Sequence, residues 1–139
     1  MSQPIQLLVN NPTRFILIKD KKNMPCKVYL TMNGIYNSPG HRVRTKLFNA
    51  GKMELLVAGA HQLPKMEAPI KISLLFKDTT NSDLDNVSFF WFKCLADILK
   101  KHNRIVDDST EYIQEYSTIY QPGARSLLFT FEKMASGIQ

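Results

Sequence analysis

Four aspartates flank one apolar segment, and their spacing is the strongest chemical signal in this sequence. Asp83 and Asp85 belong to an acidic run at 83–86 (Asp-Leu-Asp-Asn), and Asp107 and Asp108 follow the segment. Carboxylate oxygens are the ligands that hard divalent cations prefer, and clustered carboxylates repel one another unless a cation neutralises them. If the fold brings the two pairs together, they can hold Mg²⁺, with Mn²⁺ as an alternative. A calcium-binding EF-hand is excluded, because no Gly or closing Glu follows at the required spacing.

Each acidic motif also has a purely structural explanation. Asp85 and Asn86 are good helix-capping residues, because both accept hydrogen bonds from the free N–H groups of a first helical turn. Asp107 and Asp108 alone are typical of a turn. Capping is the better explanation for an isolated motif of this kind, so the metal hypothesis depends on the two pairs acting together.

The distribution of charge gives a second indication. The chain has 139 residues and a net charge of +6. Residues 1–77 hold twelve Lys or Arg and three Asp or Glu (+9), and residues 78–139 hold six and nine (−3), which sum to +6. A basic half beside an acidic half suits nucleic acid bound around a metal site. Many small basic domains bind no nucleic acid, so charge alone does not show that this chain binds it.

Hydrophobic periodicity predicts the elements that must position these residues. Alternating apolar residues predict strands over 27–32, 69–77, 111–120 and 126–133, and short apolar runs predict strands over 5–9 and 15–19. Helices are expected over 45–62 and 87–106, with a loop over 33–41. In the second helix, residues at helical spacing form the expected core stripe: Val87, Phe90, Trp91, Cys94, Leu95 and Ile98. The order of elements predicts an α/β (α+β) fold, a mixed sheet with two main helices packed on it.

The length fits a single domain. Residues 1–24 are interpreted as an N-terminal extension that forms a hairpin, and residues 25–139 as the main domain. Cys26 and Cys94 are too few and too far apart for a metal knuckle. Neither a secretory pattern nor a bilayer-spanning segment is visible. We therefore expect a cytoplasmic protein with reduced thiols and no membrane partner.

The order of the motifs resembles the RusA-type Holliday junction resolvases, which are magnesium-dependent endonucleases of phages and prophages. The resemblance rests on the run 83–86, the helix after it, and the acidic pair 107–108 before a strand. Upstream it includes the run 30–33 (Leu-Thr-Met-Asn), a short loop with Tyr36, and the basic run 41–46 (His-Arg-Val-Arg-Thr-Lys). It covers about residues 27–133, so 25–139 is interpreted as a RusA-like nuclease domain.

The resemblance implies an activity and a set of acidic site residues. The catalytic metal ligands carry over to Asp83, Asp85 and Asp108, with Asp107 as a lower-ranked neighbour. The implied reaction is Mg²⁺-dependent hydrolysis of phosphodiester bonds in four-way junctions or other branched DNA, in recombination and repair. A four-way junction needs two matched nicks, so a homodimer is expected. The implied location is the cytoplasm of a bacterium or of a phage-infected host.

Basic and polar residues upstream are the expected DNA contacts. Arg42, Arg44 and Lys46 would bind backbone phosphates, and Asn33 belongs to the family-like segment before them. His41 has three open roles: general base, phosphate contact or plain loop residue. Weaker candidates for phosphate binding are Arg14, Lys21 and Lys22.

Lys93 has two open interpretations. When the family pattern is aligned backwards from the pair 107–108, its essential lysine falls on Lys93. When it is aligned forwards from Asp83, the same position falls on Phe89. The chain thus carries four extra residues, about one helical turn, which places Lys93 about 12 Å along the helix axis from Asp85. Lys93 either stabilises the scissile phosphate or forms an i,i+4 ion pair with Asp97.

Two other functions stay open at this point. The first is a non-catalytic protein that binds branched or duplex DNA, in which the acidic run only caps a helix. The second is a metal-dependent nuclease with another DNA target.

Overall fold

The computed structural model describes residues 4–38, 40–80 and 83–135. The elements in chain order are β1 (Ile5–Asn10), β2 (Phe15–Lys19), β3 (Pro25–Tyr29), α1 (Met32–Tyr36), α2 (His41–Val57), the 3₁₀ helix η1 (Ala60–Gln62), β4 (Ile70–Asp78), α3 (Leu84–Lys101), β5 (Ile113–Pro122) and β6 (Ser126–Lys133).

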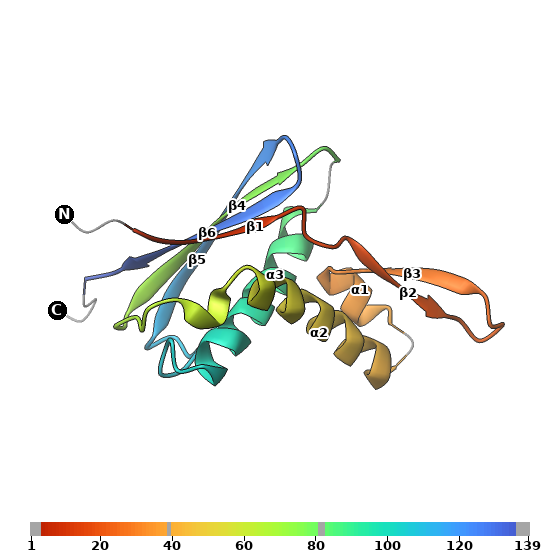
Figure 1. Ribbon diagram of the computed structural model, residues 1–139, viewed down its shortest axis with the longest axis horizontal. Coiled ribbons are helices and arrows are strands. Elements are labelled where there is room, and N and C mark those ends of the chain that lie inside the picture. The colour runs from red at the N-terminus through yellow and green to blue at the C-terminus, as the bar shows by residue number, and fades with distance from the viewer. Residues whose placement is uncertain (1–3, 39, 81–82, 136–139) are drawn as a thin grey trace.

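The main sheet has the strand order β1-β6-β4-β5. β6 runs antiparallel to both β1 and β4, whereas β5 lies parallel to β4. The segment β4–α3–β5 is therefore a crossover unit, in which the helix returns the chain to the end of the sheet where β4 began. Helices α2 and α3 lie on one side of the sheet (Figure 1). The predicted mixed sheet with two main helices packed on it is confirmed.

The core lies between the sheet and α3. Burial alternates along β4, as expected for a strand with one face against helices. All six residues of the predicted stripe on α3 are buried, so this prediction is confirmed: Val87, Phe90, Trp91, Cys94, Leu95 and Ile98. Phe76, Leu127 and Phe129 from the sheet complete the same cluster.

The N-terminal strands pair differently from the prediction. β1 joins the edge of the main sheet, with Ile5 opposite Phe131 and Asn10 opposite Ser126. β2 pairs with β3 in a separate two-stranded sheet. The expected hairpin within residues 1–24 is therefore wrong, and the hairpin that forms crosses the expected boundary between residues 24 and 25.

Turn chemistry explains where this hairpin forms. Asn11 adopts a left-handed conformation (φ 46°) after β1, where the chain leaves the main sheet. The tight turn comes later, where the Asp20 carboxylate accepts hydrogen bonds from the backbone N–H groups of Lys22 and Met24, both at 2.9 Å. The β2–β3 hairpin projects from one end of the molecule, to the right in Figure 1.

A buried ion-pair cluster fixes the root of the hairpin. Asp78, the last residue of β4, is 0% exposed and contacts Arg14 and Arg125, with Arg125 Nη1 at 2.7 Å from its Oδ2. Arg125 also donates to the backbone carbonyl of Pro12 at 2.7 Å. Burial acts to raise the pKa of Asp78, but hydrogen bonds from Arg14, from the backbone N–H of Thr79 and from Arg125 together outweigh it and hold the pKa below its usual value. Arg14, a weaker candidate for phosphate binding, is thus part of a structural ion pair.

The helix ends also differ from the prediction. α2 begins at residue 41 instead of 45, α3 spans 84–101 instead of 87–106, and part of the expected 33–41 loop is the short helix α1. α3 ends where Asn103 adopts φ 57°. The backbone N–H groups of Asn103 and Arg104 then bond to the carbonyls of Lys100 and Leu99, which is a Schellman motif.

Candidate functional site

α3 separates the two acidic pairs of the sequence. Asp83 is the N-cap of the helix and Asp85 lies in its first turn, whereas Asp107 and Asp108 follow its C-terminus. The 18 residues of this helix extend for about 27 Å at 1.5 Å per residue. Within one chain, the crossover topology therefore keeps the two pairs at opposite ends of the sheet. Among the described residues, no three Asp, Glu, His or Cys side chains gather in a group that could hold one metal ion.

Asp83 and Asp85 form an exposed pair at the start of α3. The Asp83 side chain makes no capping hydrogen bond, although it occupies the N-cap position. Neither carboxylate takes part in an ion pair with another described residue. Their position is favourable because the N-terminal end of a helix carries partial positive charge. Mg²⁺ keeps several waters and is often held by only one or two carboxylates plus substrate phosphate, so these two residues fit it as a partial site.

The second acidic pair already has a cationic partner, Lys100, which offsets one of its two negative charges. Lys100 Nζ lies 3.1 Å from Asp107 Oδ1 and 3.9 Å from Asp108 Oδ1. The hydrogen bond from Lys100 holds the pKa of Asp107 below its usual value. Asp107 Oδ1 also accepts the backbone N–H of Asp108 at 2.9 Å. In a single chain, the structural explanation fits this pair.

Lys93 points along the helix towards its C-terminal half. Its Nζ lies 3.5 Å from Asp97 Oδ1, one turn further on. Asp97 Oδ2 is also 3.5 Å from Lys52 Nζ, which links α3 to α2. This geometry favours the ion-pair interpretation of Lys93. Phe89, the other aligned position, lies one turn after Asp85 and is 58% exposed.

The helix α1 connects the acidic pair to the basic segment. The backbone N–H of Asn33 donates to the Asn86 side-chain oxygen at 2.5 Å. The predicted DNA contact Asn33 therefore lies directly beside the run 83–86, although 53 residues separate the two in the chain. Asn86 acts as a tether between two elements here, instead of capping its own helix.

The first turns of α2 carry an unneutralised basic surface. His41, Arg42, Arg44 and Lys46 are all exposed, and none forms an ion pair with another described residue. The N-cap, Gly40, has no side chain to cap the helix, and the first turn holds no acidic residue. Positive side chains at the positive end of a helix are unfavourable, and the free N–H groups there need acceptors. A bound phosphate would satisfy both requirements.

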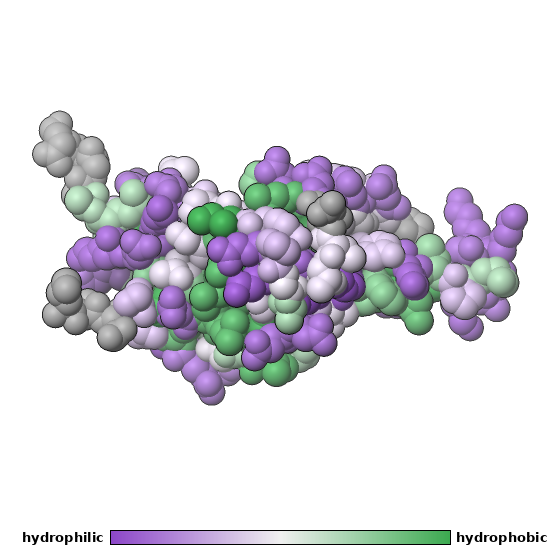
Figure 2. Space-filling model, turned by 90° about the horizontal axis from the view of Figure 1, so that it is seen from above, coloured by the Kyte–Doolittle hydropathy of each residue, from purple (hydrophilic) through white to green (hydrophobic). Residues whose placement is uncertain are grey.

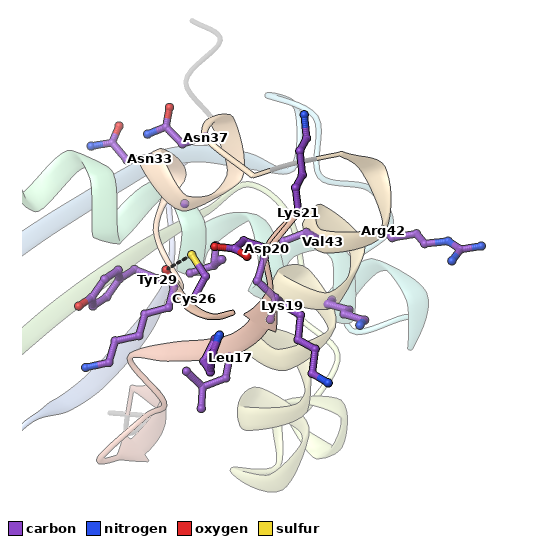
Figure 3. Close-up of a pocket in the computed structure, with 16 residues that line it drawn as sticks. Leu17, Lys19, Asp20, Lys21, Cys26, Tyr29, Asn33, Asn37, Arg42 and Val43 are labelled. Carbon is purple, nitrogen blue, oxygen red and sulfur yellow. Dashed lines mark hydrogen bonds between the residues drawn. The ribbon is translucent and has the colours of Figure 1, made fainter. Parts of the chain in front are cut away.

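A groove that the sequence analysis missed lies beside this surface. A cavity of about 1170 Å³ separates the β2–β3 hairpin from α1 and α2 (Figure 3). Five basic side chains and one acidic side chain line it: Lys19, Lys21, Lys27, Arg42, Lys46 and Asp20. The dense lysines of residues 19–27 were visible in the sequence, but only the pairing of β2 with β3 shows that they face α2.

Comparisons with known proteins add no assignment, since no protein-family model and no curated protein matches this chain significantly. Within the described part of the chain, no helix is both long enough and apolar enough to cross a membrane.

Proposed function

We propose that this chain is a Mg²⁺-dependent endonuclease that hydrolyses phosphodiester bonds in four-way junctions or other branched DNA, and that it acts as a homodimer. The observation that carries the proposal is the pair Asp83 and Asp85, exposed, without an ion-pair partner among the described residues, and joined through α1 to an unneutralised basic surface. The motif order that resembles RusA-type resolvases supports the same function.

Each group of residues has a distinct role in this proposal. Asp83 and Asp85 would hold Mg²⁺, or Mn²⁺ in its place, and the bound ion would activate water and stabilise charge on the phosphate oxygens. Arg42, Arg44 and Lys46 bind backbone phosphates and fix the position of the DNA. His41 opens α2 within this basic group, on a different helix from the carboxylates, which favours its role as a phosphate contact.

A homodimer accounts for the position of the second acidic pair. Two-fold symmetry joins equivalent surfaces of two copies, so the Asp83 end of one α3 can meet the Asp108 end of the other. Each site would then combine Asp83 and Asp85 with Asp108 of the partner subunit. Two equivalent sites would supply the two matched nicks that resolve a four-way junction.

Cleavage of a fluorescently labelled four-way junction tests the proposal. We expect paired nicks in Mg²⁺, no nicks in EDTA, and little cleavage of linear duplex of the same sequence. Asp83→Asn should abolish cleavage while junction binding persists, because only a carboxylate near phosphate is lost. Asp97→Asn, which removes a carboxylate from the far half of the same helix, is the matched control and should cleave normally. Normal turnover by Asp83→Asn would contradict the assignment.

The separation of the two acidic pairs favours a second candidate, a non-catalytic protein that binds branched or duplex DNA. In that case Asp83 and Asp85 only stabilise the start of α3, and the other pair only forms ion pairs with Lys100. The same assay then shows junction binding without nicks. Equal cleavage of linear duplex and junction would instead indicate a nuclease with another DNA target.

A further inference from the structure

The groove beside the β2–β3 hairpin has the size and shape for a chain-like ligand. Its volume of about 1170 Å³ exceeds the roughly 300–1,000 Å³ of pockets that enclose small molecules. One wall is the hairpin and the other is formed by α1 and the first turns of α2. The β2–β3 hairpin extends beyond the helices, so its tip lies away from α1 and α2 (Figure 1).

The hairpin wall presents an apolar face that the helices cover only in part. Ile16 and Val28 are one cross-strand pair on this face, and Ile18 and Cys26 are the next. Val28 is 8% exposed at the root, Ile18 is partly buried, and Cys26 is exposed near the tip. On the opposite wall, Val43 is also partly buried. Apolar surface is thus available along the groove.

Basic side chains surround this apolar surface. Lys19 and Lys21 extend from the hairpin and Arg42 from α2, around a centre occupied by Asp20 and Cys26 (Figure 3). Viewed from above, hydrophilic side chains cover the hairpin tip, with apolar ones next to them (Figure 2). Asp20 offsets one of these positive charges, and its carboxylate accepts hydrogen bonds from two backbone N–H groups of its own turn. Lys27 also lines the groove, and its Nζ lies 4.6 Å from the Phe15 ring centroid.

We propose that this groove binds one unpaired DNA strand, with its bases against the apolar wall and its phosphates on Lys19, Lys21, Arg42 and Lys46. The inference rests on the proposed function, since it names the part of a branched DNA that the hairpin would hold. A single strand exposes base faces and phosphates together, and grooves for single strands combine positive charge with apolar or aromatic contacts. A duplex buries its base faces in the stack, so it would leave the apolar wall of this groove uncovered.

Cys26 offers a direct test in the unmodified protein. It lines the groove and is exposed, whereas Cys94 is 0% exposed and burial raises its pKa to about 12, which makes it unreactive. Alkylation of Cys26 by iodoacetamide, followed by mass spectrometry in EDTA, therefore reports on occupancy without cleavage. The probe is an oligothymidylate of about 12 nucleotides, within the roughly 4–16 nucleotides that such grooves hold. At about ten times its Kd it should slow alkylation about tenfold, because only the unbound fraction reacts.

Three results would overturn the proposal. The first is binding of the oligothymidylate, seen by fluorescence anisotropy, without protection of Cys26. The second is equal protection by a duplex of the same length. The third is protection that grows with protein concentration in the absence of DNA, which would show that a second copy of the chain covers the groove.

The salt dependence of DNA binding tests Lys19 and Lys21 independently of the alkylation assay. The double variant Lys19→Gln, Lys21→Gln should make the negative slope of log affinity against log salt for single-stranded DNA less steep by about 1.4, at about 0.7 per lost phosphate contact. Lys65→Gln, an exposed lysine outside the groove, is the matched control and should leave the slope unchanged. An unchanged slope in the double variant would contradict the proposal. Protection of Cys26 by the oligothymidylate without any junction cleavage would support the groove proposal and contradict the proposed nuclease. Junction cleavage without protection of Cys26 would support the nuclease and contradict the groove proposal.

Discussion

Asp78 is the single residue on which the position of the hairpin most depends. Its carboxylate is completely buried and binds both Arg14, which precedes β2, and Arg125, which precedes β6. Asp78→Asn should lower the free energy of unfolding by about 3 kcal/mol, because Arg125 would be left buried without its partner. This is the lower end of the usual range, since the Arg14 side chain is 37% exposed and water can solvate it. Urea unfolding measures the loss, and Asp97→Asn, which weakens two partly exposed ion pairs with Lys93 and Lys52, should cost at most about 1 kcal/mol.

The same carboxylate predicts how stability depends on pH. The folded-state pKa of Asp78 lies below its usual value, so the unfolded chain takes up the proton first as pH falls. The stabilisation is therefore fully present above the unfolded pKa of about 3.9 and is lost as pH drops through the lower folded value. The urea midpoint of the native chain should fall over this range, and the Asp78→Asn variant should show a shallower decrease. Parallel pH profiles for the two proteins would contradict this account.

Lys93 is the residue whose two interpretations lead to opposite kinetic results. Its amine lies 3.5 Å from Asp97 and is directed along the helix away from Asp85. We expect Lys93→Ala to retain junction cleavage, with a loss of stability of at most about 0.5 kcal/mol. The measurement is kcat under saturating junction, alongside binding affinity. A large drop in kcat with unchanged affinity would instead assign Lys93 to the transition state.

At the scale of elements, periodicity predicted which segments are helices and strands but not how the strands pair. The stripe on α3 has a clear helical period and was predicted residue by residue, because burial against a sheet leaves that signature. β1 and β2 carry equally apolar runs, and nothing in their local pattern says that one joins β6 while the other joins β3. Pairing across more than a hundred residues depends on the whole sheet, so local sequence cannot indicate it.

Helix boundaries were missed for local reasons. Periodicity detects only the buried side of a helix, so the predicted helix at 45–62 omits the exposed first turn of α2, which holds Arg42 and Arg44. α3 ends before the predicted residue 106 because Asn103 adopts a left-handed conformation. Asn favours this conformation at helix ends, so the sequence does carry this signal. The corrected boundaries place Arg42 and Arg44 in the first turns of α2 and Asp85 in the first turn of α3.

Gly51 sets the distance between α2 and α3. A Cβ added there would lie 2.8 Å from Cys94 Sγ and 2.8 Å from a ring carbon of Phe90, both fully buried. Gly51→Ala should therefore destabilise the fold by about 1–3 kcal/mol through overpacking, despite the higher helix propensity of Ala. Thermal unfolding measures the effect. Asn49→Ala, at an exposed position of the same helix, is the control and should be neutral or slightly stabilising.

At the scale of the whole molecule, the four aspartates that flank α3 form two separate pairs within one chain. The sequence shows that Asp83, Asp85, Asp107 and Asp108 bracket a helix, but a helix of 18 residues keeps its ends apart. The basic residues, by contrast, gather from β2, β3 and α2 around one groove, which local patterns did not reveal. Residue types therefore indicate which side chains could bind metal or phosphate, whereas their proximity depends on the crossover and on the hairpin.

Mixing two inactive variants tests whether sites form between two copies. Asp83→Asn and Asp108→Asn should each abolish cleavage as homodimers. In a mixed dimer, one site would contain both substitutions and the other would contain Asp83 from the Asp108→Asn chain and Asp108 from the Asp83→Asn chain. That second site would be intact, so the mixture should regain single-strand nicking of a junction, with at most one nick per dimer. If each site were built within one chain, both sites of the mixed dimer would stay defective and no activity would return. Mixing Asp83→Asn with Asp85→Asn is the matched control, because both changes lie on the same end of α3 and no intact site can form from them.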